Sequence, residues 1–293
     1  MHFPVSGVLP VDKPSGVTSR HVVDAVARAL AMQGVGHAGT LDPLARGVVV
    51  VCVGHATRLV DFLHALPKRY AATFLLGRSS PSDDLETELV VEADPLRPQR
   101  AEVDAALGGF RGDILQQPCD YSAVHVDGKR AYRLARKGRP VSLAAKPVRI
   151  ERLEMVAYEW PRLGLEITCS AGTFVRAIGR DLAATLGTTA VMESLVRTAV
   201  GPFGIEAALP LDAVGPDTVR AALLPPLAAV AHLPRVNLEG ETLDRVVRGG
   251  FIEGDLSTAD AVAACDAAGA LVGVLQRHAT GRYRLRPNFR GAG

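Results

Sequence analysis

A short polar loop near the start of the chain carries the side chains best suited to chemistry. It reads GHAGTLDPLARG, from Gly36 to Gly47, and contains one histidine, His37, and one aspartate, Asp42. An Asp-Pro pair often does no more than make a turn, because aspartate accepts local backbone hydrogen bonds and proline fixes φ. This loop, however, is built of small residues and leads directly into the apolar run VVVVCVG, a setting in which catalytic groups tend to lie. Asp42 is therefore the first candidate for a catalytic carboxylate.

Two other interpretations of this region fit the pattern less well. The glycines at 34, 36 and 39 match G-x-G-x-x-G, but a dinucleotide-binding fingerprint needs a strand before the glycines and a helix after them. The pattern here predicts the reverse order. The histidines His37, His55 and His64 do not have the spacing of a standard metal-ligand set. The sequence thus predicts neither a nucleotide cofactor nor a metal ion at this loop.

The expected secondary structure places the loop between a helix and a buried strand. The first helix should begin with Ser19 as its N-cap, and the pattern changes after Pro234 to short strands and glycine-rich turns, as in a small separate module. Strands and helices that do not alternate strictly predict an α+β sheet rather than a doubly wound parallel one. The predicted strands are 5–11, 48–53, 68–77, 121–126, 148–156 and 163–169, and the predicted helices are 19–30, 57–66, 102–110, 173–186 and 217–224.

Length and composition narrow the class of protein. The chain has 293 residues, of which 48% are hydrophobic and 22% charged, so it is long and apolar enough to bury a sizeable core. No run approaches the roughly eighteen apolar residues of a membrane span, and the first residues lack the pattern of a secretory signal. The four cysteines lie far apart without a C-x-x-C pair, so neither a disulfide framework nor a zinc site is predicted. The reducing cytoplasm is the expected compartment.

The net charge is only +2, but basic residues are clustered in two places. The segment KRAYRLARKGR, from Lys129 to Arg139, contains no acidic residue, and helical spacing would place Arg130, Arg133 and Lys137 on one face. Each cluster fits either a solvated surface or contact with a polyanion such as a nucleic acid. The second cluster consists of Arg277, Arg282, Arg284, Arg286 and Arg290, interleaved with Tyr283 and Phe289.

The loop from Gly36 to Gly47 resembles the catalytic-aspartate motif of the bacterial tRNA pseudouridine-55 synthases of the TruB type. Other segments resemble the same family in the same order, over residues 5 to 205, and agreement of this many segments makes the resemblance highly specific. They are GVLPVDKPSGVTS at 7–19, KRY at 68–70, QP at 117–118, YSA at 121–123, GKRAY at 128–132, AR at 135–136, CSAGTFVR at 169–176 and the closing segment at 195–203.

The resemblance implies a pseudouridine synthase fold, an α+β architecture in which helices flank a mixed, largely antiparallel sheet, followed by a small C-terminal PUA-like β-barrel module. The catalytic domain would span 1–231, with an RNA-gripping insertion near 125–149, and the PUA-like RNA-binding domain would span 232–293. The implied reaction isomerises the uridine at position 55 in the T-loop of tRNA, without a cofactor or metal. The implied partner is tRNA, bound at its T-arm and at its acceptor end through the C-terminal module, with no membrane and no obligate protein partner.

Roles for individual residues also follow from the resemblance. Asp42 would be the catalytic carboxylate, ionised at neutral pH because its ordinary pKa is about 3.9. Arg176 would orient Asp42 and hold it as an anion in a pocket shielded from water. Tyr70 would lie against the target base, although its strand pattern alone favours core packing. The residues implied to bind RNA are His37, Phe174, Leu195, Lys129, Arg130, Tyr132 and Arg136.

Four positions depart from the family pattern and bear on RNA contact, while the implied catalytic residues are intact. The residue types do not distinguish nucleophilic attack by Asp42 from assisted elimination. Two other functions stay open: a tRNA-binding or folding factor with an idle pocket, and a pseudouridine synthase for another RNA. The departures are Phe174 for tyrosine, His125 for lysine, Cys119 for proline and Val196 for arginine.

Overall fold

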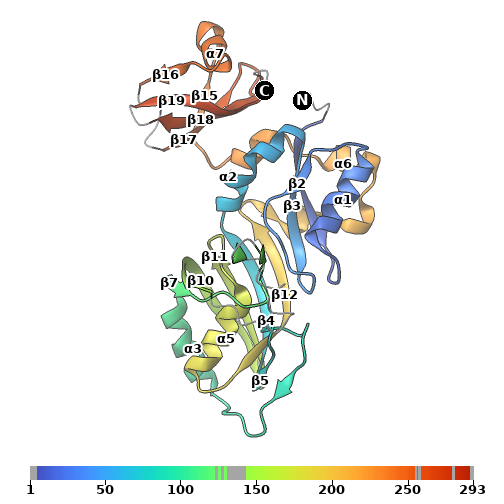
Figure 1. Ribbon diagram of the computed structural model, residues 1–293, viewed down its shortest axis with the longest axis vertical. Coiled ribbons are helices and arrows are strands. Elements are labelled where there is room, and N and C mark those ends of the chain that lie inside the picture. Colours follow the sequence, from blue (N-terminus) through green and yellow to red (C-terminus); the bar gives the residue numbers. More distant parts are fainter. Residues whose placement is uncertain are drawn as a thin grey trace.

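The computed structural model describes residues 5–122, 143–254, 256, 259–278 and 281–290, together with the backbone of strands β8 (His125–Val126) and β9 (Lys129–Arg130). These residues form a ten-stranded sheet, a five-stranded sheet and two two-stranded ribbons (Figure 1). One ribbon pairs β8 with β9, and the other pairs β5 (Arg78–Ser79) with β6 (Val90–Val91). None of the helices within these ranges has the length and apolar character needed to cross a membrane.

The strands of the large sheet are β1 (Gly7–Lys13), β2 (Val35–His37), β3 (Arg46–Val53), β4 (Lys68–Leu76), β7 (Gly112–Gln116), β10 (Lys146–Glu159), β11 (Arg162–Cys169), β12 (Ala190–Val200), β13 (Phe203–Gly204) and β14 (Leu209–Pro210). They lie in the order β14-β1-β3-β12-β4-β11-β10-β7, with β2 beside β3 and β13 beside β12. Within this large sheet, the described pairings of β1 with β14 and of β3 with β12 are parallel, and its other described pairings are antiparallel. The sheet is mixed and largely antiparallel, as the sequence predicts.

Helices flank this sheet. In Figure 1, α1 and α6 lie beside the β1–β3 half of the sheet, α3 lies beside β10, and α5 lies against β4 and β12. The α-helices of this part are α1 (Ser19–Ala29), α2 (Val60–Ala65), α3 (Arg100–Leu107), α5 (Val175–Thr185) and α6 (Pro216–Ala222), with 3₁₀ turns at Gly54–Leu59, Gly108–Phe110, Ile205–Ala207, Leu211–Ala213 and Pro226–Val230.

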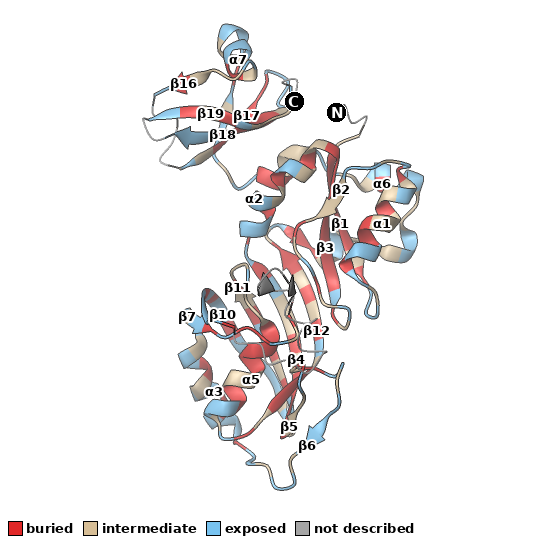
Figure 2. Cartoon of the chain, in the orientation of Figure 1, coloured by how far each residue is buried: buried red, intermediate tan, exposed pale blue. Residues whose placement is uncertain are grey.

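The core runs along the middle strands of the sheet, which Figure 2 shows as mostly buried. On β4 the alternation of side chains sends Ala72, Phe74 and Leu76 into this core, and Tyr70 lies at the partly buried end of the same face. Helix α5 packs closely on the strand, because a Cβ at Gly179 would come within 2.1 Å of the Phe74 ring. The predicted strand face of residues 70 to 76 is confirmed.

The C-terminal module is a curled five-stranded sheet with one helix, α7 (Gly240–Val247). Its strand order is β15-β17-β18-β19-β16, and its own core includes Val246, Leu275 and Tyr283. Ala263 and Val274, however, belong to the same buried cluster as residues of the large sheet, so the module packs on the first part of the chain. The strands are β15 (Arg235–Asn237), β16 (Phe251–Glu253), β17 (Ala261–Cys265), β18 (Leu271–His278) and β19 (Arg282–Asn288). The module matches the PUA-like expectation, while the boundary at 231/232 stays a prediction.

Three local predictions are wrong. Helix α1 has Thr18 rather than Ser19 as its N-cap, since the Thr18 hydroxyl accepts from the His21 amide. The segment predicted as one helix at 57–66 begins as a 3₁₀ turn and becomes α-helical only at Val60. Of the strand predicted at 121–126, residues 125–126 are a strand, whereas Tyr121 and Ser122 form a bend, and the two residues between lie outside the described ranges. The first difference reflects a contact with a distant part of the chain, since the Ser19 hydroxyl bonds both the amide and the carbonyl of Leu41.

Candidate active site

Seven consecutive backbone carbonyls in the loop that carries Asp42 accept hydrogen bonds. The donors come from β1 and the turn after it, from the start of α1, from the loop itself and from β12. A loop whose polar backbone groups are satisfied in this way has one strongly preferred conformation. The donor and acceptor residues are Arg197 to Gly39 and to Thr40 (both 3.1 Å), Ser19 to Leu41 (3.1 Å), Ala45 to Asp42 (3.1 Å), Gly16 to Pro43 (2.8 Å), Ser15 to Leu44 (2.7 Å) and Lys13 to Ala45 (2.5 Å).

Two buried cations provide much of this support. The ammonium of Lys13 is fully enclosed, and burial lowers its pKa to about 8, although the charge of Asp42 acts in the opposite direction. The guanidinium of Arg197 is also buried and donates from Nε to the carbonyl of Val48 at 2.7 Å. The close approach of β12 to the loop requires Gly47, because a Cβ there would lie 2.3 Å from the Arg197 carbonyl oxygen.

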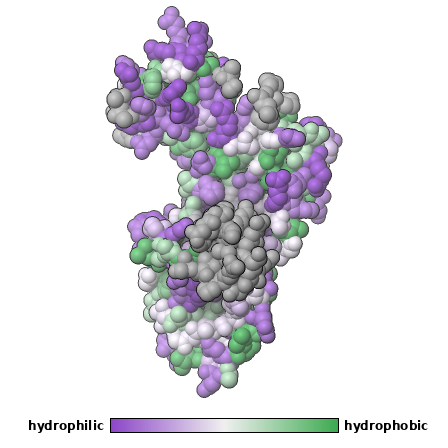
Figure 3. All heavy atoms as spheres, in the orientation of Figure 1, coloured by the Kyte–Doolittle hydropathy of each residue, from purple (hydrophilic) through white to green (hydrophobic). Residues whose placement is uncertain are grey.

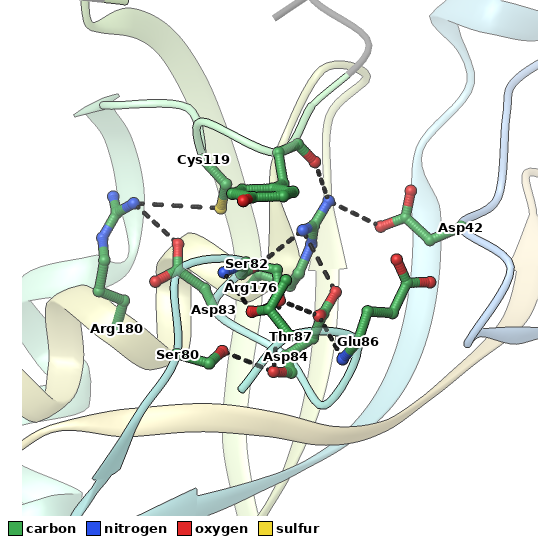
Figure 4. A network of polar contacts seen from close by, with 11 residues as sticks. Asp42, Ser80, Ser82, Asp83, Asp84, Glu86, Thr87, Cys119, Arg176 and Arg180 are labelled. Atoms are coloured by element: carbon green, nitrogen blue, oxygen red, sulfur yellow. Dashed lines mark hydrogen bonds and ion pairs between the residues drawn. The ribbon is translucent and has the colours of Figure 1, made fainter. Parts of the chain in front are cut away.

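Arg176 bridges two carboxylates, as Figure 4 shows. Its Nη2 lies 3.0 Å from Asp42 Oδ2, and its Nη1 lies 3.2 Å from Asp84 Oδ2. The side chains of Arg176 and Asp84 are 7% and 2% exposed, whereas that of Asp42 is 40% exposed. Burial alone would lower the pKa of Arg176, but Asp42 and the neighbouring carboxylates outweigh burial and raise it. The predicted pair of Asp42 and Arg176 is therefore in direct contact, with Asp42 more open to solvent than expected.

Two hydrogen bonds to backbone carbonyls further fix the orientation of the Arg176 guanidinium. Arg176 Nη1 donates to the carbonyl of Ser82 at 2.7 Å, and Nη2 donates to the carbonyl of Tyr121 at 3.0 Å. Asp84 is fixed in turn by the Ser82 hydroxyl and by the amide of Glu86 at 3.0 Å. The sequence analysis did not single out Asp84, which lies in the polar stretch after β5. An acidic residue among serines and threonines was the available signal, and it is too common to identify a site.

A cavity of about 330 Å³ opens beside this ion pair. Its volume is at the lower end of the range for small-molecule sites, about 300–1,000 Å³. The cavity therefore brings together five of the residues that the sequence analysis named, from four separate segments of the chain. The lining residues are Asp42, Tyr70, Phe174, Arg176 and Leu195, with Thr40, Leu41, Ser122, Thr173 and Val175.

Tyr70 and Leu195 supply the apolar part of the lining. Burial raises the pKa of Tyr70, and the charge of Arg197 lowers it only in part, so the phenol stays protonated at neutral pH. Leu195 lies on β12 directly opposite Ala72 of β4, and its side chain is buried except where it meets the cavity. A neutral ring and an aliphatic side chain form a surface on which a planar base can pack.

Gln116 holds the backbone of Phe174, the N-cap residue of α5. Its buried amide donates from Nε2 to the Phe174 carbonyl at 3.0 Å and accepts from the Phe174 amide at 2.7 Å. Because Arg176 follows two residues later, this clasp also fixes the point from which Arg176 extends. No local pattern marked Gln116, since its role depends on a segment 58 residues away.

His37 lies in a second cavity, of about 560 Å³, which shares Asp42, Arg176 and Ser122 with the first. Burial, together with the charge of Arg197, lowers the pKa of His37, so its ring is neutral at neutral pH. The side chains of Lys129 and Arg130, and all of Tyr132 and Arg136, lie outside the described residues. The backbone at 129–130 forms strand β9, so the helical spacing considered for Arg130 does not hold at that position.

The remaining candidate features lie away from the cavities. Over the described ranges of the chain, no group of three or more histidine, cysteine, aspartate or glutamate side chains is arranged to hold a metal ion. The C-terminal module presents a largely hydrophilic face in Figure 3. Three of its five clustered arginines are already in ion pairs, which are Arg277 with Asp260, Arg282 with Glu253 and Arg290 with Asp266.

Solved structures share this fold along nearly the whole chain. One, described as "Crystal Structure of a Cbf5-Nop10-Gar1 Complex", matches with a TM-score of 0.72 at 25% identity, over 94% of this chain and 79% of that one. Another, "Structure of H/ACA RNP bound to a substrate RNA containing 2'-deoxyuridine", matches with a TM-score of 0.72 at 22% identity, over 97% and 84%. The second likeness supports the fold alone.

Sequence relatives identify the family. A family model described as "TruB family pseudouridylate synthase (N terminal domain)" matches residues 27–175. A protein of Mycobacterium avium (strain 104) named "tRNA pseudouridine synthase B" is 47% identical over 70% of this chain and 68% of its own length. One of the same name from Gloeobacter violaceus is 41% identical over 90% and 96%. The fold and these matches define a pseudouridylate synthase. The chain belongs to the TruB family of these enzymes.

Proposed function

We propose that this chain isomerises the uridine at position 55, in the T-loop of tRNA, to pseudouridine. The coarser function, pseudouridine synthesis in tRNA, is that of the curated relatives. The observation that carries the proposal is the pairing of Asp42 with Arg176 at 3.0 Å on the wall of a cavity that Tyr70 and Leu195 also line. This arrangement supports a reaction in which one carboxylate acts on a nucleotide whose base packs against an apolar wall.

The reaction is balanced without any external reagent. The C1′–N1 bond of uridine breaks, the uracil turns, and a C5–C1′ bond forms. The proton on C5 is lost to solvent, and N1 gains a proton. Asp42 would act at the sugar while Arg176 keeps it ionised and oriented. Both direct attack and assisted elimination need the carboxylate next to the ribose, so the same geometry supports either route.

Access to the cavity requires the target uridine to leave the stacked T-loop. Extrusion of a base costs a few kcal/mol, and stacking on an aromatic ring returns about 1–3 kcal/mol. Tyr70 would therefore recover much of the cost. The neutral ring of His37 would occupy the space that the base leaves, and Phe174 would pack nearby. Binding of the T-arm phosphates by Lys129, Arg130, Tyr132 and Arg136 stays a prediction.

Contact of the C-terminal module with the acceptor end of tRNA is a separate part of the proposal. Phosphates there would compete with the carboxylates that already pair with Arg277, Arg282 and Arg290. The module would then add affinity rather than decide which uridine is modified. A protein with this role acts in the cytoplasm, where tRNA matures.

A tritium-release assay tests the function directly. A tRNA transcript labelled with tritium at C5 of its uridines should release one equivalent of label per tRNA, and a transcript with cytidine at position 55 should release none. No release from either transcript would leave the idle-pocket alternative, a tRNA-binding factor. Release from ribosomal RNA but not from tRNA would favour a synthase for another RNA. Mapping pseudouridine in cells that lack the protein checks the position independently.

A further inference from the structure

Ser122 has a buried hydroxyl that is without a partner among the described residues. Its side chain is 3% exposed, and its Oγ accepts or donates no hydrogen bond there. Buried polar groups are nearly always hydrogen-bonded, so an exception calls for a reason. The same is true of two other atoms, Asp12 Oδ1 and His37 Nδ1. Of these three, Ser122 alone belongs to a residue that lines the cavity beside Asp42 and Tyr70.

The position of Ser122 is set by the catalytic ion pair. Arg176, which contacts Asp42 at 3.0 Å, also donates to the carbonyl of Tyr121 at 3.0 Å. One guanidinium thus holds both the carboxylate and the residue directly before Ser122. Ser122 lines both the 330 Å³ and the 560 Å³ cavity, so this residue lies where the two meet.

The neighbouring hydroxyl in the same cavity behaves differently. Thr173 also lines the pocket, but its Oγ1 donates to the carbonyl of Ser170 at 3.1 Å. The Thr173 hydroxyl is therefore satisfied within the turn that precedes α5. Among the described residues Ser122 has no such local partner, although the residue lines the same cavity.

We propose that Ser122 is a substrate-binding residue whose hydroxyl forms a hydrogen bond with the uridine that enters the pocket. A serine hydroxyl both donates and accepts, which suits a nucleotide whose base presents different edges before and after it turns. Within the described part of the chain the hydroxyl has no partner, and the substrate would supply one. This inference rests on the proposed function, because it takes uridine in RNA as the occupant.

The melting temperature of the free enzyme distinguishes a substrate-binding role of Ser122 from a structural role. Ser122→Ala removes a hydroxyl that has no partner to lose, so the melting temperature of the free enzyme should stay the same or rise. Ser19 is the matched control, since it is 2% exposed and its hydroxyl bonds both the amide and the carbonyl of Leu41. Ser19→Ala should lower the melting temperature. A fall for Ser122→Ala as large as that for Ser19→Ala would overturn the proposal.

Activity provides the second measurement. Single-turnover tritium release by Ser122→Ala should show kcat/KM reduced by about tenfold, the value of one hydrogen bond to substrate. Ser122→Cys, with a weaker donor of similar shape, should fall between Ala and the wild type. A kcat/KM equal to that of the wild type would sink the assignment. If the wild-type enzyme itself released no label, the failure would lie with the proposed function and not with Ser122.

A substrate variant identifies the group that Ser122 binds. A tRNA with 2′-deoxyuridine at the target position removes the ribose hydroxyl next to the reacting carbon. If Ser122→Ala and the deoxy substitution together cost no more than either alone, the contact is to the ribose. If the two losses multiply, the contact is to an edge of the base. Both results support a substrate-binding role, provided that the single variant is impaired.

Discussion

Asp84 forms a buried ion pair with Arg176, at 3.2 Å, next to the exposed pair that Arg176 makes with Asp42. The two carboxylates come from different loops and differ in exposure, 2% against 40%. The enclosed carboxylate anchors the guanidinium, and under the proposed function the accessible one is left to meet a substrate. Because Asp84 fixes the guanidinium, Arg176 can hold Asp42 in place before any RNA is bound.

The first prediction concerns this anchor. Asp84→Asn leaves Arg176 buried with a single carboxylate, and breaking a buried pair typically costs about 3–5 kcal/mol of the free energy of unfolding. We expect that loss in chemical denaturation, together with a lower kcat as Arg176 loses its orientation.

Asp24→Asn is the control, because it makes the same change in a pair with Arg20 that is exposed to solvent. That pair should contribute less than about 1 kcal/mol. Equal stabilities for the two variants would show that Asp84 does not anchor Arg176.

The second prediction concerns the amide clasp on Phe174. Gln116→Leu removes both hydrogen bonds and leaves the Phe174 amide unsatisfied, while the Phe174 carbonyl keeps the bond from the Ile178 amide at 3.3 Å, so we expect a loss of about 1–3 kcal/mol in stability. Because α5 starts at this point, kcat should fall as well.

Gln117→Leu makes the same substitution one residue later, at an exposed side chain, and should retain stability and activity. Thermal denaturation and tritium release measure both variants, and an intact melting temperature for Gln116→Leu would contradict the proposed clasp.

The third prediction concerns the packing of β12 against the Asp42 loop. Gly47 has φ +110°, and a Cβ there would meet backbone atoms of Arg197 at 2.3 to 2.9 Å. Neither the backbone nor the buried guanidinium has room to move, so Gly47→Ala should unfold the enzyme at a clearly lower temperature. Gly108→Ala, at a position where a Cβ meets nothing within 4 Å, should leave the melting temperature unchanged or higher. Similar melting temperatures for the two variants would refute the close approach.

The sequence predicted the elements near the site better than the contacts between them. Periodicity located β3, β4 and α5, and the family resemblance brought together Asp42, Tyr70 and Arg176 before any coordinates. Asp84 and Gln116 were missed because their partners lie 92 and 58 positions away in the chain.

The same reason explains the error at Ser19. Its residue type suits an N-cap, but its hydroxyl is used by Leu41, 22 residues later, and Thr18 takes the capping position instead. Local residue preferences do not show that a distant backbone group competes for the serine hydroxyl.

The fourth prediction is a pH dependence. Burial lowers the pKa of Lys13 from 10.5 to about 8, and it lowers that of Lys68 to about 8 in the same way. Between pH 8 and 10.5 the unfolded chain therefore binds more protons than the folded one, so the free energy of unfolding contributed by these lysines rises with pH across this window. Titration of the lysine Nζ resonances by ¹⁵N NMR should give midpoints near 8. Midpoints near 10.5 would show that these ammonium groups are not enclosed.

The central claim is that the Asp42 carboxylate carries the chemistry. Asp42→Asn preserves the shape of the side chain and removes its charge, and the loop around it is held by backbone contacts that the substitution does not touch. The most direct measurement is tritium release by this variant under single-turnover conditions, with tRNA affinity measured in parallel by filter binding. The account predicts release at the background rate with affinity close to that of the wild type. Release at a rate near that of the wild type would contradict it.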